Sequence, residues 1–220
     1  FDTLDTGVAS IRWMTNADPS FGAIGPSHVD PRTGEILDSD IAFESLSARS
    51  VRAAKSQILG QGFTVDWAGL LQARDAAREG ALPVPEGGAG HEHDAHCRHG
   101  EFAAEQLSYA FDVLEARGEL DPDSPEAQQF VLDYLKDTTM HEVGHTLGLR
   151  HNFRSSRVYT DAQMSDDAFV RANGLAGSVM EYAPINLAAP GREPVKGFQT
   201  SLGPYDSWAI EYAYKPIDPK

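Results

Sequence analysis

Cysteine is almost absent from this chain of 220 residues, because Cys97 is its only thiol. No intrachain disulfide can form, so the fold must depend on an apolar core and on any bound metal. Hydrophobic residues make up 41% of the sequence, which at this length fits a soluble globular chain with one domain of ordinary size.

Long apolar runs and basic residues are also scarce. No stretch approaches the roughly 18 to 20 apolar residues that cross a membrane, so we expect no membrane span. Lys and Arg total 18 against 33 Asp and Glu, a formal net charge of −15. Because phosphate backbones are bound by clustered Lys and Arg, this deficit argues against nucleic acid as a partner.

The first eight residues lack the basic and apolar regions of a signal peptide, and the first residue is Phe1 rather than Met. We therefore expect a fragment or processed portion of a longer precursor, with any targeting signal upstream.

Hydrophobic periodicity predicts a mixed α/β fold. Residues 9–14 have the two-residue period of a half-buried strand, and residues 22–29 and 35–43, joined by a turn at 30–34, form a predicted hairpin. Helices are predicted at residues 46–59, 67–79, 101–117, 166–173 and 204–214. Pro and Gly residues in the segment 80–100 predict a loop.

The central helix has clear start and stop signals. Ser124 as N-cap and Pro125 at the first helical position predict a helix that runs to Leu147. Gly148 follows where a helix end needs a residue that tolerates positive φ, so the chain turns and His151 can return towards the helix.

The segment HEVGHTLGLRH, His141–His151, has the spacing of a zinc site. His141 and His145 are four residues apart, so their imidazoles project from one helix face, and His151 completes three protein ligands. Glu142 is placed to take a proton from zinc-bound water, whose pKa the metal lowers to near 7. Three protein ligands leave a coordination position open, which is typical of a catalytic site.

The same residues resemble the metzincin clan of zinc peptidases, whose pattern HExxHxxGxxH is complete here, and Ser178–Tyr182 looks like its Met-turn. The resemblance implies that Met180 forms an apolar floor beneath the zinc ligands. It also places Tyr182 where astacin-like and serralysin-like members carry a Tyr that binds zinc and then stabilises the oxyanion. The alternative is that Tyr182 packs with its hydroxyl towards solvent.

Residues 22–44 are similar to the edge strand and following strand of the clan. If so, the edge strand would pair with an extended peptide substrate through Ala23, Ile24, Gly25, Ser27 and His28. A plain surface hairpin is the alternative.

Through HVDPRTGEIL, HEVGHTLGLRHNF, SVMEYAP and GPYDSWAIEYAY, most of the chain resembles large bacterial zinc metalloproteases with a Met-zincin domain. The resemblance implies a metzincin-like α+β fold, in which a mixed N-terminal sheet packs on the active-site helix. Residues 1–148 would form an upper subdomain with a helical insertion at about 46–123, and 149–220 a lower one with the Met-turn and final helix. It also implies a periplasmic or extracellular setting.

Further metal donors are concentrated in the tract HEHDAHCRHG, namely His91, His93, His96, Cys97 and His99. Their spacing fits no standard site, so we favour a solvated loop over a second metal site. Cys97 could instead cap the catalytic zinc in a latent form, although its neighbours do not resemble the cysteine switch of matrixins. Acidic residues at Asp121, Asp123 and Glu126 would allow calcium, but no EF-hand loop supports it.

These patterns predict a broad-specificity zinc-dependent endopeptidase with one zinc ion, Glu142 as general base and a peptide or protein as substrate. One alternative is a zinc-binding module of a larger protein with weak or lost turnover. Another is hydrolysis of a different bond, because zinc with a carboxylate base is not restricted to peptides.

Overall fold

The computed structural model describes residues 5–15, 22–44, 97–121 and 123–216. The helices predicted at 46–59 and 67–79, and the donors His91, His93 and His96, lie outside this described part. No helix within it is long and apolar enough to cross a membrane.

The described elements are of both kinds, which confirms the expected mixed α/β class. The strands are β1 (Ser10–Met14), β2 (Ala23–Ile24), β3 (Ser27–Val29) and β4 (Ile36–Glu44). The helical elements are α3 (His99–Ala116), α4 (Pro125–Thr146), the 3-10 turn η1 (Ser155–Arg157), α5 (Asp161–Met164), α6 (Asp167–Asn173) and α7 (Pro204–Tyr214). The predictions missed η1 and α5, and α3 begins two residues earlier than predicted.

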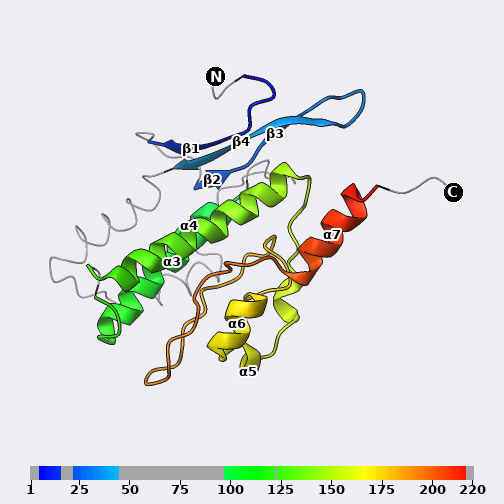
Figure 1. The fold of residues 1–220 in the computed structure, drawn as a ribbon. Coiled ribbons are helices and arrows are strands. Elements are labelled where there is room, and N and C mark those ends of the chain that lie inside the picture. The colour runs from blue at the N-terminus through cyan, green and yellow to red at the C-terminus, as the bar shows by residue number, and fades with distance from the viewer. Residues whose placement is uncertain (1–4, 16–21, 45–96, 122, 217–220) are drawn as a thin grey trace, which may run out of the picture. The chain divides into compact units, whose positions relative to one another are not determined.

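A mixed sheet is organised around β4, as Figure 1 shows. β1 runs parallel to β4, with Ser10 opposite Asp40 and Met14 opposite Glu44. β2 and β3 run antiparallel to β4, and a hydrogen bond from the Asp40 N–H to the Pro26 carbonyl continues the pairing between them. Among the described strands, β2 and β3 therefore form an edge of the sheet.

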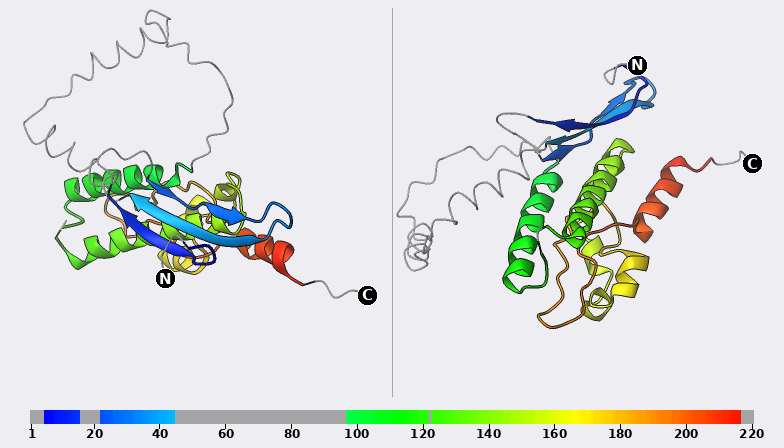
Figure 2. Two further views of the ribbon diagram at one scale, coloured as in Figure 1. Left: turned by 90° about the horizontal axis from the view of Figure 1, so that it is seen from above. Right: turned by 60° about the vertical axis from the view of Figure 1, so that its left-hand side comes forward.

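The core joins the sheet to the two long helices. One cluster, on α3, α4 and the C-terminal part, contains Ala103, Ala104, Leu107, Tyr134 and Phe198. A second cluster, on the sheet, contains Ala23, Ile41 and Phe43. Leu135 of α4 packs against both clusters, so burial of apolar surface holds the central helix against the sheet. Two turned views show the same packing of α3 and α4 beside the sheet (Figure 2).

The start and end of α4 agree with the predicted signals. The Ser124 hydroxyl accepts a hydrogen bond from the Ala127 N–H at 3.1 Å, and Pro125 occupies the first turn. Leu147 is the C-cap, and Gly148 has a φ of 81°. A residue with a Cβ would be strained at this φ, whereas glycine is not. Gly148 therefore lets the chain reverse direction directly after the helix.

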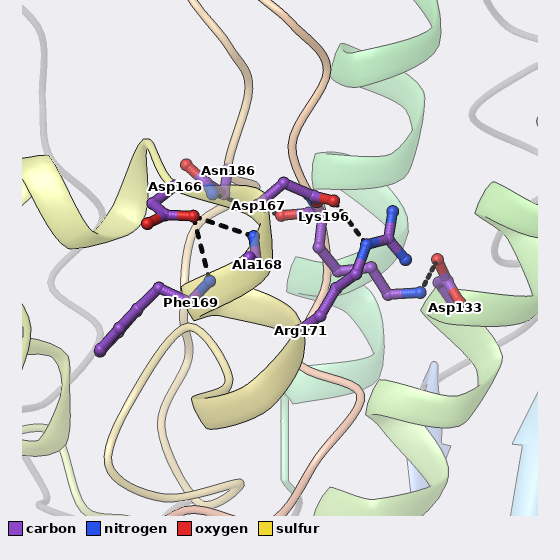
Figure 3. A network of polar contacts seen from close by, with 8 residues as sticks. All are labelled: Asp133, Asp166, Asp167, Ala168, Phe169, Arg171, Asn186 and Lys196. Atoms are coloured by element: carbon purple, nitrogen blue, oxygen red, sulfur yellow. Dashed lines mark hydrogen bonds and ion pairs between the residues drawn. The ribbon is translucent and has the colours of Figure 1, made fainter.

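A polar network ties the chain after Gly148 to α4 (Figure 3). The Lys196 ammonium lies 2.6 Å from the Asp133 carboxylate of α4, and both side chains are largely buried. The Lys196 N–H donates to the Asp167 carboxylate at the start of α6 at 2.9 Å. The Asn186 amide donates to the Lys196 carbonyl at 3.2 Å, so one residue connects α4, α6 and the loop before α7.

We predict that Lys196→Met lowers the free energy of unfolding by about 2 kcal/mol, because the Asp133 carboxylate loses its charged partner in a largely buried position. Lys215→Met is the matched control, since its exposed pair with Glu211 contributes no more than about 0.5 kcal/mol. Urea denaturation followed by circular dichroism measures both. Equal losses would mean that the buried pair adds nothing to stability.

Candidate metal centre

The structure brings together the three histidines of the predicted zinc motif. His141 and His145 lie one turn apart on α4, and the reversal at Gly148 returns His151 to them. The Nε2 atoms of His145 and His151 are 3.0 Å apart. The four candidate ligand atoms of His141, His145, His151 and Cys97 lie within 4.8 Å of one another.

Two backbone carbonyls set the orientation of the helix histidines. His141 Nδ1 lies 2.7 Å from the Val179 carbonyl oxygen, and His145 Nδ1 lies 3.0 Å from that of Leu149. A carbonyl only accepts, so each Nδ1 must carry the proton and each Nε2 has a free lone pair. This arrangement is the one found around metal-binding histidines.

Burial keeps these imidazoles uncharged. It lowers the pKa of His141, His145 and His151 below the ordinary value for histidine. Metal ligation requires the neutral form, and three converging imidazole nitrogens suit zinc. The donor set therefore fits the zinc ion that the sequence predicts.

Glu142 lies beside His141 in the interior of the site. Its side chain is fully buried, and neither carboxylate oxygen has a hydrogen-bond partner among the described residues. Burial raises the pKa of the Glu142 carboxyl to about 7. A carboxyl group buried without partners destabilises the fold, which is typical of a group retained for function.

Cys97 belongs to this centre, a position that the sequence interpretation judged improbable. Its Sγ lies 3.3 Å from His141 Nε2 and 3.4 Å from His151 Nε2. Burial, and then the nearby Glu142 carboxylate, raise the pKa of the Cys97 thiol to about 11. The expectation of a solvated loop is therefore wrong for Cys97.

The same expectation is wrong for His99, which begins α3 and is almost completely buried. Its ring stacks on that of His141, with centroids 3.9 Å apart and planes 4° from parallel. Its Nδ1 has no hydrogen-bond partner in the described part, and burial lowers the pKa of His99 to about 3. His99 thus packs against one face of the His141 ring. The Gly-rich and His-rich sequence around His99 did not predict this contact.

Met180 and Tyr182 flank the histidines from the C-terminal part. Met180 is fully buried and packs so closely on α4 that a Cβ on Gly144 would lie 2.2 Å from its sulfur. The Tyr182 hydroxyl lies 3.3 Å from Cys97 Sγ and accepts a hydrogen bond from the Arg98 N–H at 3.0 Å. Met180 therefore packs on α4 at Gly144, next to His145, and Tyr182 contacts Cys97 and Arg98.

The strand predicted to bind substrate lies against α4. Ala23 is buried, whereas Ile24, Gly25 and Ser27 are partly exposed. A Cβ on Gly25 would come within 2.6 Å of the Glu142 carbonyl oxygen, so the edge strand passes directly over α4. The exposed imidazole of His28 pairs with Asp38 of β4.

Asp206, at the start of α7, holds the turn that orients His141. Its carboxylate accepts hydrogen bonds from the Ser178 hydroxyl at 2.5 Å, the Val179 N–H at 2.9 Å and the Gly203 N–H at 2.8 Å. Val179 in turn accepts the bond from His141 Nδ1. The carboxylate thus acts on the histidine through the backbone of Val179.

We predict that Asp206→Ala weakens zinc affinity at least about tenfold, the scale of change seen when groups behind metal ligands are removed. Competition with a fluorescent zinc chelator measures it. Glu211→Ala, an exposed change on the same helix, is the control and should leave the affinity unchanged. An unaltered zinc affinity in Asp206→Ala would exclude this orienting role.

Comparison with known proteins bears on the second half of the chain. Residues 123–220 match a family model described as Met-zincin. This range contains α4, the three histidines, Glu142 and the turn at Met180. The match supports a metzincin-type zinc metalloprotease domain. No curated protein and no solved structure matches the chain.

Proposed function

We propose that this chain, whose residues 123–220 match a family model described as Met-zincin, is a zinc-dependent endopeptidase. One observation carries the proposal. Neutral imidazole nitrogens of His141, His145 and His151 converge on one point, and the unpartnered carboxylate of Glu142 is buried beside them. That combination is what hydrolysis by a metal and a general base requires.

Zinc bound by the three imidazoles would act as a Lewis acid and lower the pKa of water. Glu142 takes the proton from the attacking water on a carboxylate oxygen and delivers it to the leaving amine nitrogen. Tyr182 is the candidate donor to the developing oxyanion, because its ring lies 4.9 Å from that of His151.

We propose an extended peptide as the substrate. β2 and β3 form a sheet edge that passes over α4 beside Glu142. Main-chain groups at such an edge can pair with an added strand and read little of its sequence, which favours broad specificity. A periplasmic or extracellular location stays a prediction.

A zinc-binding module with little turnover is the second candidate, and one observation favours it. The Cys97 thiol lies with the three histidines, and four protein ligands around zinc are typical of structural sites. The intact and buried Glu142 favours the peptidase, because a structural site has no use for a buried base.

We predict that Glu142→Ala lowers cleavage of casein at least about 100-fold, the scale of a lost general base, while one equivalent of zinc remains bound. Because Cys97 could restrict the parent, the comparison is made in both the parent and a Cys97→Ser background. Fluorescence release from labelled casein and atomic absorption give the two readouts.

Glu126→Ala, in the exposed first turn of the same helix, is the control and should cleave casein at the parental rate. Equal cleavage with and without Glu142 would contradict the proposed mechanism.

A further inference from the structure

We propose that Cys97 is a fourth protein ligand of the zinc ion and keeps the peptidase in a latent state. The inference rests on the proposed function, because it concerns the regulation of the same site. It assigns a role to the only thiol in the chain.

Three of the distances between the donor atoms are close to those of a tetrahedral zinc site. With zinc bonds of about 2.1 Å to nitrogen and 2.3 Å to sulfur, a tetrahedron has edges of about 3.4 Å between nitrogens and about 3.6 Å between nitrogen and sulfur. Cys97 Sγ lies 3.3 and 3.4 Å from the Nε2 atoms of His141 and His151. The Nε2 atoms of His145 and His151 are 3.0 Å apart. These three separations are close to tetrahedral edges, and all four ligand atoms lie within 4.8 Å of one another.

The approach of Cys97 is built into the packing of α3. A Cβ on Gly100 would lie 2.3 Å from the Ala23 N atom of β2, and one on Gly22 would lie 2.4 Å from the Glu101 N atom. Only glycine at both positions allows so close a contact between the helix start and the strand. This contact fixes the segment that carries Cys97 above the histidines.

Two hydrogen-bond donors also face the sulfur. The His99 N–H points to Sγ at 3.5 Å, and the Tyr182 hydroxyl lies 3.3 Å from it. Such donors stabilise a coordinated sulfur. A separate sign of a metal ion here is the set of three neutral imidazoles, whose candidate ligand atoms lie within 4.8 Å of the sulfur and of one another.

A sulfur ligand at this point excludes the water that hydrolysis needs. Four protein ligands complete a tetrahedral site, whereas a catalytic site leaves one position open. The Tyr182 hydroxyl meanwhile accepts a hydrogen bond from the Arg98 N–H, so the cysteine segment also engages the candidate oxyanion donor. Withdrawal of this segment would free the fourth position and Tyr182 together.

X-ray absorption at the zinc edge tests the ligand directly in the full chain loaded with one equivalent of zinc. We expect one sulfur at about 2.3 Å in the parent and none in Cys97→Ser or Cys97→Ala. Tyr109→Phe, on the exposed side of the same helix, is the control and should keep the sulfur. A parent spectrum with nitrogen and oxygen ligands alone would overturn the inference, whatever the variants do.

Casein cleavage tests latency and separates the two proposals. We expect Cys97→Ser and Cys97→Ala to cleave at least about tenfold faster than the parent, because the fourth position opens. A zinc–sulfur bond with faster cleavage in the variants supports both proposals. Equal cleavage by active parent and variants overturns latency and leaves the peptidase intact. A zinc–sulfur bond with no cleavage by any form overturns latency and the proposed function, and leaves the ligand assignment.

Discussion

The candidate metal centre depends on three uncharged imidazoles whose nitrogens lie close together. Burial keeps His141, His145 and His151 neutral, and carbonyls from Val179 and Leu149 direct the two helix rings. Keeping three imidazoles buried and close together is unfavourable on its own, and a bound zinc ion would supply free energy that offsets this cost.

Much of the described structure serves to hold these rings in place. The sheet and α3 pack on α4 through Leu135, and His99 supports the His141 ring from α3. From the other side, Asp206 of α7 fixes the turn whose Val179 carbonyl meets His141. Distant segments of the chain therefore converge on the orientation of one histidine.

The features predicted well are those that local sequence determines. The limits of α4, the reversal at Gly148 and the final helix follow from caps, proline, glycine and periodicity within a few residues. The grouping of His141, His145 and His151 follows from helix spacing and one turn. The hairpin was also expected, because alternation and turn residues mark it, whereas the mixed sheet was expected from the resemblance to metzincins.

The features that were missed depend on contacts between distant segments. Cys97 reaches the histidines because the backbones at Gly22 and Gly100 touch, and no local pattern encodes that contact. His99 is buried for the same reason, although its surrounding tract is polar. η1 and α5 are only 3 and 4 residues long, too short for a periodic signal.

The central claim, that these histidines form a zinc centre, is tested most directly by the crystal structure of zinc-loaded protein with anomalous data at the zinc edge. The account predicts one peak about 2.1 Å from Nε2 of His141, His145 and His151. No peak between these atoms, or a sole peak at the tract His91–His96, would contradict it.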